Sequence, residues 1–305
     1  MNQNLSQFDI STAWPEGHVG YCAILGRPNA GKSTFLNHLL GYHLAAVSDK
    51  PQTTRRRWLG IFIDHESQIL FLDTPGVHKP VHALGKHMAA SINRVIEETD
   101  TLLCLADAKR GPGREEEMVA HHAAQTDKTT FVAVNKSDVA SDEEIERTMS
   151  FWQARLPQAP QYVISASQGY NCPELVGGIK NALSWGPFLF EPDTITDAME
   201  RQIAAEYIRE ATYTHLHHEI PHATAVTIEH WEENNSARHI YANLHVERAQ
   251  QRHILLGAKG RMIRNIREYA EDGLSNLWET PVKVHLWVKV SHNWRKKPKR
   301  AAELA

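Results

Sequence analysis

The chain has 305 residues, of which 42% are hydrophobic and 23% charged, with a formal net charge of −3. This composition indicates a soluble globular protein of about two domains, and no apolar run approaches the ~20 residues of a membrane span. The polar segment Met1–Gly17 resembles neither a signal peptide nor a transit peptide, so we expect a disordered lead-in to a cytoplasmic protein. Three widely spaced cysteines, Cys22, Cys104 and Cys172, are predicted to be free thiols.

The strongest motif lies near the start of the chain. Apolar Tyr21–Leu25 precedes a G-x-x-x-x-G-K-S sequence, and a helical pattern follows to Leu40. Strand, glycine-rich turn and helix together predict a phosphate-binding loop, in which backbone N–H groups and the helix dipole face an anion. Lys32 is expected to reach the β- and γ-phosphates of a nucleotide, and Ser33 to ligate Mg²⁺. The predicted phosphate-binding residues are Gly26, Arg27, Pro28, Asn29, Ala30, Gly31, Lys32, Ser33 and Thr34.

A polar stretch, Val47–Arg55, separates this helix from the strand-like run Trp58–Ile63. A loop at this place can reach back over a bound nucleotide and change order with the γ-phosphate. Thr54, next to Thr53, is the residue predicted to complete the Mg²⁺ shell and to take part in catalysis.

A buried strand at Ile69–Leu72 ends in Asp-Thr-Pro-Gly, which is Asp73, Thr74, Pro75 and Gly76. Asp73 is predicted to hold Mg²⁺ through a water molecule, and Gly76 to offer its N–H to the γ-phosphate. Val77 stands where a water-positioning glutamine is found in Ras-like enzymes. We therefore expect slow intrinsic hydrolysis, or a catalytic group supplied from elsewhere, with Lys32, Thr54, Asp73 and Gly76 as the catalytic set.

The base is predicted by a third motif. The strand Thr130–Val134 ends in Asn-Lys-Ser-Asp, which is Asn135, Lys136, Ser137 and Asp138. An aspartate can accept hydrogen bonds from both donors on the guanine edge, a pair that adenine lacks. The backbone of Ser165, Ala166 and Ser167, after a sixth strand beginning near Tyr162, could meet the guanine carbonyl. These features favour GTP and GDP over adenine nucleotides.

Helical patterns alternate with the six strands of this first half, at 84–98, 114–125, 142–154 and 174–185. This order predicts an α/β P-loop GTPase domain with a mostly parallel six-stranded sheet, and ligand loops at the carboxyl ends of its strands.

The second half begins after a proline-containing linker and predicts a smaller α+β domain. A helix at about 197–217 and strands at 223–231 and 240–247 precede Gly257-Ala258-Lys259-Gly260, and a last strand covers 282–290. G-x-x-G between an apolar run and a helix is typical of KH domains, which clamp about four nucleotides of single-stranded RNA. The basic run Arg248–Arg267, without Asp or Glu, supports this interpretation. The predicted RNA-binding residues are Arg252, Gly257, Ala258, Lys259, Gly260, Arg261 and Arg264.

With these motifs in this order, the chain from about Gly20 to Trp294 resembles the Era family of bacterial ribosome-assembly GTPases. The resemblance implies a type II KH domain, binding near the 3′ end of small-subunit (16S) rRNA, control of that binding by GTP, and a role in small ribosomal subunit assembly. It also matches Asn29 to a position that helps to bind K⁺ in some relatives. The domains implied are 18–188 for the GTPase, 189–200 for a linker, 201–294 for the KH domain and 295–305 for a basic tail. A monomer is expected, with peripheral association with the inner membrane through basic residues as a further expectation.

Three alternatives stay open at this point. One is a related P-loop GTPase acting in other RNA maturation, and the G-x-x-G half argues against it. The second is an RNA-binding protein whose nucleotide is only a structural ligand, which Val77 keeps open. The third is an ATP-dependent enzyme, which Asp138 opposes.

Overall fold

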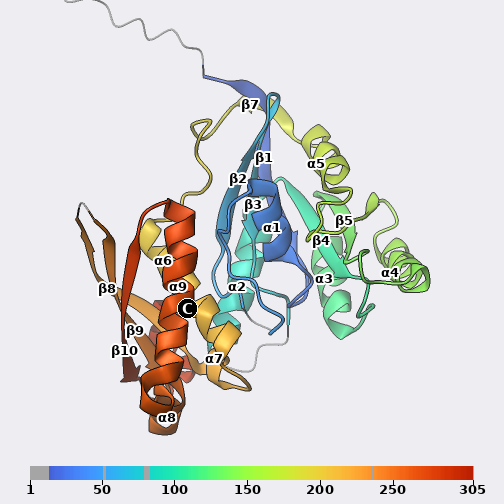
Figure 1. Cartoon of the computed structure of the whole chain (residues 1–305). Helices are drawn as coiled ribbons and strands as arrows, with labels where there is room; N and C mark the ends of the chain where they lie inside the picture. The colour runs from blue at the N-terminus through green and yellow to red at the C-terminus, as the bar shows by residue number, and fades with distance from the viewer. Residues whose placement is uncertain (1–13, 51–52, 79–82, 235, 305) are drawn as a thin grey trace, which may run out of the picture.

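The computed structural model describes residues 14–50, 53–78, 83–234 and 236–304, and these form two units joined in sequence (Figure 1). The first unit is a seven-stranded sheet in the order β2-β3-β1-β4-β5-β6, with β7 paired to β1. Its strands are β1 (Glu16–Leu25), β2 (Trp58–Ile63), β3 (Ser67–Asp73), β4 (Thr101–Asp107), β5 (Thr129–Asn135), β6 (Gln161–Val163) and β7 (Ser184–Pro187). Strands β1, β3, β4, β5 and β6 are parallel, while β2 and β7 pair antiparallel.

Helices cover both faces of this sheet, which explains why its central strands are continuous apolar runs. The helices are α1 (Lys32–Leu40), α2 (Ala83–Glu98), α3 (Arg114–Ala124), α4 (Asp142–Arg155) and α5 (Cys172–Asn181). Phe35 of α1 and Leu175 of α5 lie in one buried cluster, whereas Ile92 of α2, Val119 of α3 and Trp152 of α4 lie in another. The loops at the carboxyl ends of β1, β3, β4 and β5 are thereby brought to one edge, as the α/β prediction requires.

The second unit is a three-stranded sheet with helices on one side (Figure 1). Its elements are α6 (Glu200–His215), α7 (Ile220–Ala223), β8 (Ala225–Glu233), β9 (Arg238–Val246), α8 (Ala249–Leu256), the 3₁₀ turn η1 (Ala258–Gly260), α9 (Arg261–Trp278), β10 (Val282–Val290), η2 (Trp294–Lys296) and α10 (Pro298–Leu304). Strand β9 pairs antiparallel with β8 and parallel with β10. From α6 to β10 the α-helices and strands follow the order helix-helix-strand-strand-helix-helix-strand, which agrees with the predicted GTPase-plus-KH fold class.

The structure differs from the sequence expectations at three places. The helix predicted over 174–185 stops at Asn181, and Ser184–Pro187 instead forms β7, a seventh strand beside β1. Glu16 and Gly17 belong to β1, although they were expected in a disordered lead-in, whose residues 1–13 lie outside the described part. Residues 298–304, expected in a tail, form α10, whose Ala301 and Leu304 are buried with Leu84 and Met88 of α2.

The cysteine prediction is confirmed, since all three thiols are free and buried. Within the described residues, no helix is long and apolar enough to cross a membrane. The same residues contain no group of three or more His, Cys, Asp or Glu side chains arranged to hold a metal ion.

Candidate nucleotide and nucleic-acid sites

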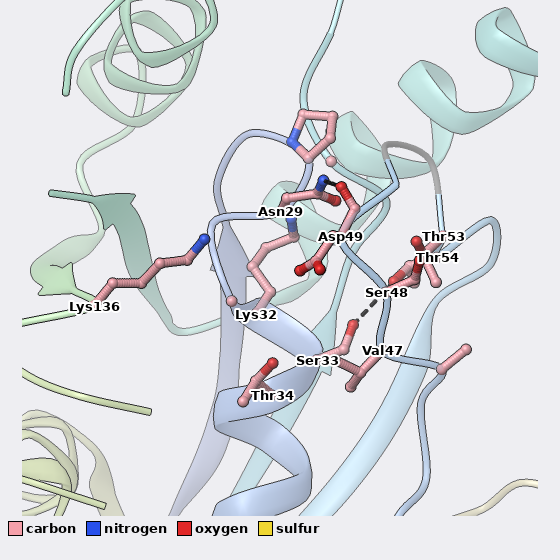
Figure 2. Close-up of a pocket in the computed structure, with 14 residues that line it drawn as sticks. Asn29, Lys32, Ser33, Thr34, Val47, Ser48, Asp49, Thr53, Thr54 and Lys136 are labelled. Carbon is pink, nitrogen blue, oxygen red and sulfur yellow. Dashed lines mark hydrogen bonds between the residues drawn. The ribbon is translucent and has the colours of Figure 1, made fainter. Parts of the chain in front are cut away.

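A pocket lies where β1 ends and α1 begins (Figure 2). Its lining comes from the predicted phosphate loop, from residues 46–49 with Thr53 and Thr54, from Gly76 and from Lys136. The pocket therefore joins three of the sequence motifs.

Lys32 lies in the first turn of α1, bent back along the loop. Its ammonium donates to the carbonyl oxygens of Gly26 at 3.2 Å and Arg27 at 2.9 Å. Burial lowers the pKa of Lys32 to about 8, against the charge of Asp73, which raises it. An anion beside this ammonium would favour the charged form, so the site suits a phosphate.

Three oxygen-bearing side chains meet at the next position of the helix. The Ser33 hydroxyl donates to Asp73 Oδ2 at 2.7 Å. The Thr54 hydroxyl lies 2.9 Å from the Ser33 hydroxyl, a contact drawn in Figure 2. Asp73 is fully buried, its Oδ1 has no hydrogen-bond partner among the described residues, and burial raises its pKa to about 6 despite Lys32 and Ser33. Oxygen donors with one unpartnered buried carboxylate oxygen fit Mg²⁺, which prefers such ligands. These are the three residues that the sequence predicts for the metal.

The Asp-Thr-Pro-Gly segment packs directly on the phosphate loop. The Thr74 hydroxyl donates to the carbonyl of Ile24 at 2.8 Å, and a Cβ at Gly76 would lie only 2.5 Å from the backbone nitrogen of Pro28. The Val77 N–H donates to the Gly26 carbonyl at 3.0 Å, and its side chain is buried in the core. The Val77 side chain therefore offers no polar group that could position a water molecule, as the sequence predicts from the absence of a glutamine here.

The Asn-Lys-Ser-Asp motif braces the loops around it. Asn135 donates to the Ala30 carbonyl at 2.8 Å and accepts from the Ala166 N–H at 2.9 Å, so one amide ties the phosphate loop to the Ser-Ala-Ser loop. Asp138 accepts a hydrogen bond from the Ser165 hydroxyl at 2.7 Å, and this hydroxyl lies 3.2 Å from that of Ser167. The Ser137 N–H donates to the carbonyl of Ile164 at 3.2 Å.

A buried ion network that the motifs do not announce supports these loops. Arg27 lies 2.9 Å from Glu116 and 3.3 Å from Asp107, and Lys136 lies 2.8 Å from Asp107. Burial raises the pKa of Asp107, but Lys136 and Arg27 outweigh it and lower that pKa overall. The position of Asp107 at the end of β4, on the ligand edge, is the sequence signal that could have indicated its role.

The described part of the segment 43–55, residues 43–50 and 53–55, also contacts the second unit. The Arg55 guanidinium is buried and donates to the carbonyls of Thr224 at 2.7 Å, Pro221 at 3.1 Å and His222 at 3.0 Å. The Lys50 ammonium donates to the carbonyls of Tyr213 and Leu216 at the end of α6.

Backbone and side-chain bonds to α6 extend this contact. The N–H groups of Ala46 and Val47 donate to Glu206 at 3.2 Å and to Glu210 at 3.3 Å, and His43 lies 2.8 Å from Glu210. One side of this segment therefore lines the pocket, and its other side is attached to α6 and α7.

The G-x-x-G loop connects α8 to α9 with a left-handed backbone. Gly257, Lys259 and Gly260 have φ values of 67°, 52° and 72°. A Cβ at Gly257 would lie 2.6 Å from that of Met262, whereas Gly260 has open space around it. The remaining predicted RNA-binding side chains are all exposed, namely Arg252, Ala258, Lys259, Arg261 and Arg264.

Comparison with known proteins decides the family. Residues 21–136 match a family described as 50S ribosome-binding GTPase, and residues 219–295 match the KH domain family. A protein of Thermotoga petrophila named GTPase Era is 39% identical over 91% of this chain and 93% of its own length, and its Leuconostoc citreum counterpart is 37% identical over 92% and 93%. The chain belongs to the Era family of GTPases.

Solved Era structures share the whole fold with this Era-family chain. A crystal structure of an Aquifex aeolicus Era variant bound to GDP·AlF₄⁻ has a TM-score of 0.90 and 35% identity, covering 94% of this chain and 99% of that one. A second Era structure, holding MgGDPNP and nucleotides 1506–1542 of 16S ribosomal RNA, has a TM-score of 0.90 and 34% identity, covering 95% and 99%.

Proposed function

We propose that this chain is a GTP-hydrolysing switch that binds the 3′ region of small-subunit rRNA and acts in small ribosomal subunit assembly. The observation that carries the proposal is the meeting of Ser33, Thr54 and Asp73 beside Lys32, in a chain whose other unit presents an exposed basic G-x-x-G loop. The Era relatives bound to a GTP analogue with 16S rRNA, and to GDP·AlF₄⁻, support the same ligands here.

Each residue has a proposed part. Ser33 and Thr54 would hold Mg²⁺, with Asp73 reaching it through water, and the ion would supply neutralisation of the phosphate charge. Lys32 neutralises the γ-phosphate as water attacks in line, and the Gly76 N–H binds a γ-phosphate oxygen. Asp138 reads the guanine edge, while Asn135 holds the two loops that enclose the base. The Asn29 amide nitrogen donates to the Asp49 carbonyl. The side-chain oxygen of Asn29 is then the atom that would bind K⁺.

The remaining features follow from the same proposal. The exposed side chains of Lys259, Arg261 and Arg264 neutralise RNA phosphates at the G-x-x-G loop. The proposed domains are 18–188 for the GTPase, 189–200 for the linker, 201–294 for the KH domain and 295–305 for the basic C-terminal segment. Strand β1 begins two residues before the first of these ranges, and α10 in the last one docks on α2. The protein acts as a monomer in the cytoplasm, with peripheral association with the inner membrane through its basic residues.

Nucleotide specificity and turnover test the first half of this proposal. We expect phosphate release from GTP in the presence of Mg²⁺. Asp138→Asn should weaken GTP binding roughly 100-fold or more, since two hydrogen bonds to a charged carboxylate are lost, and should favour xanthosine triphosphate. Asp142→Asn, an exposed change of the same chemistry at the start of α4, is the matched control. Unchanged GTP affinity in Asp138→Asn would overturn the base assignment.

The buried Val77 favours one other function, an RNA-binding protein with a structural nucleotide. That candidate predicts tight GTP binding and no phosphate release at any protein concentration. Multiple turnover by the unmodified chain, abolished in Lys32→Ala, would exclude it.

A further inference from the structure

The outer face of the KH sheet carries a row of aromatic side chains that the proposed function does not use. Helices α6 and α9 pack on the opposite face, where Ile240, Ala242 and Val284 are buried (Figure 1). Strand side chains alternate between faces, so His239, Tyr241, His285 and Trp287 share the face turned away from these helices. We call these four residues the ring row.

The rings of this row are stacked nearly parallel. The Tyr241 and His285 rings lie 4.5 Å apart at 15°, and those of His239 and His285 lie 5.7 Å apart at 11°. The Trp287 ring lies 6.1 Å from that of Tyr241 at 17° and is 52% exposed. Trp287 thus ends the row, with one face against Tyr241 and half of its surface open to solvent.

Positive charge borders the open end of the row. Lys289 follows Trp287 on the same face of β10. Its side chain is 54% exposed, and its ammonium lies 3.9 Å from the Glu229 carboxylate. The charge of Arg300 on α10, which pairs with Glu303 at 2.9 Å, also acts at this end. It acts on His245, the register partner of Lys289, whose pKa is lowered by burial and then by Lys289 and Arg300, against Glu229. Lys296, Lys297 and Lys299 are exposed beside Arg300 in sequence.

The docking of α10 brings this basic helix to the same face of the sheet. Ala225 pairs with His245 in the sheet, so their side chains point to the same side. Ala225 is buried with Ala301 and Leu304, which places α10 at the end of the outer face. The ring row therefore continues into a basic border and is open at Trp287.

An exposed indole face next to exposed cations has the chemistry that binds single-stranded nucleic acid, because bases stack on aromatic rings while cations neutralise phosphates. Of the acidic side chains near these cations, Glu229 on β8 lies 3.9 Å from Lys289, and Glu303 of α10 lies 2.9 Å from Arg300. Lys283 on β10 and the three lysines before Arg300 add further exposed positive charge. We propose that Trp287 and Lys289, with the basic border of α10, form a second contact for single-stranded RNA, separate from the G-x-x-G loop. This contact extends the RNA strand bound under the proposed function, and it requires an RNA longer than the loop alone can clamp.

The test compares two RNA lengths on the full chain, by fluorescence anisotropy with saturating nucleotide. A single-stranded RNA of about five nucleotides fills the G-x-x-G clamp alone, since such a loop holds about four. One of about 15 nucleotides can also reach Trp287. Trp287→Ala should lower the affinity for the long RNA roughly 5- to 150-fold, the loss expected for one stacked base. It should leave the affinity for the short RNA unchanged. Trp287→Phe should retain most of the affinity, because a ring remains.

Two further variants make the result specific. Trp185→Ala removes another exposed tryptophan, 63% exposed on β7 of the first unit, and should bind both RNAs normally. Lys289→Ala should reduce the slope of log affinity against log salt concentration for the long RNA by about one, the value for one lost phosphate contact. Unchanged affinity for the long RNA in both Trp287→Ala and Lys289→Ala would overturn the inference and leave this face for a protein partner. Failure of the unmodified chain to bind the short RNA would instead contradict the proposed G-x-x-G function.

Discussion

Thr54 and Arg55 are neighbours in the chain, yet their side chains reach into different units. The Thr54 hydroxyl lies 2.9 Å from that of Ser33 at the pocket, and the Arg55 guanidinium donates 2.7 Å to the Thr224 carbonyl at the start of β8. A ligand that moves Thr54 must therefore strain or shift the contacts of Arg55. This pair gives a direct physical route from nucleotide to RNA-binding domain.

Arg55→Ala tests this route. We expect the ratio of RNA affinities between the GTP-analogue and GDP forms to fall towards one, because the carbonyls of Pro221, His222 and Thr224 lose their shared donor. Arg57→Ala removes an exposed arginine that pairs with Glu98 at 3.2 Å, and it should keep the ratio of the unmodified chain. RNA binding measured with each nucleotide decides this, and an unaltered ratio in Arg55→Ala would rule out this connection.

Thr54→Ala should discriminate between the two nucleotides. The hydroxyl is expected to reach Mg²⁺ only when a γ-phosphate orders the loop. Affinity for a GTP analogue with Mg²⁺ should therefore fall about tenfold, roughly the contribution of one charge-assisted hydrogen bond, while affinity for GDP stays the same. Titration of both nucleotides with and without Mg²⁺ measures this. Equal losses for GDP and the analogue would mean that Thr54 only supports the fold.

Arg27→Ala should destabilise the nucleotide-binding unit. Arg27, Asp107 and Glu116 are almost entirely buried. Removing the guanidinium leaves Glu116 without its ion-pair partner, which should lower the free energy of unfolding by about 3–5 kcal/mol. We expect a clearly lower thermal midpoint and weaker GDP binding. Arg155→Ala removes a surface arginine whose partner Glu117 is half exposed, and it should change the midpoint little. Similar midpoints for the two variants would show that the buried network contributes no more than a surface pair.

His43 should make the contact between the units pH-dependent. Burial lowers the pKa of His43, but the hydrogen bond and charge of Glu210, together with Glu206, outweigh it and raise that pKa overall. A raised folded-state pKa gives stability that is fully present below the unfolded value of about 6.5 and is lost as pH rises through the folded value. The difference in thermal midpoint between the unmodified chain and His43→Gln should be larger at pH 5.5 than at pH 8. A difference independent of pH would contradict this assignment.

Most of the nucleotide site could be predicted from local sequence motifs. The phosphate loop, the Asp73 turn and Asn135–Asp138 are short segments whose chemistry fixes their residues, and they follow buried strands with strong apolar patterns. The pairing of β7 with β1 could not be predicted, because Ser-Trp-Gly-Pro has no strand pattern and is extended only through its partner.

Burial of charged groups was the other feature beyond the sequence. Arg55 stands in a polar stretch whose sequence suggests exposure to solvent. It is buried because α6 and α7 pack against it, and backbone carbonyls near α7 accept hydrogen bonds from its guanidinium. The apolar side chains of α10, Ala301 and Leu304, are too few to indicate that this basic helix docks on α2. Both depend on contacts between segments far apart in the chain.

The most direct test of the account is RNA affinity in the two nucleotide states. A single-stranded RNA carrying the sequence of the 3′ end of small-subunit rRNA would be titrated against the full chain with GDP and with a non-hydrolysable GTP analogue, each with Mg²⁺. We predict tighter binding with the analogue, and loss of binding in a chain carrying both Gly257→Asp and Gly260→Asp. Equal affinity in both nucleotide states, with GTP-analogue binding verified, would contradict the claim that the nucleotide site controls the RNA-binding unit.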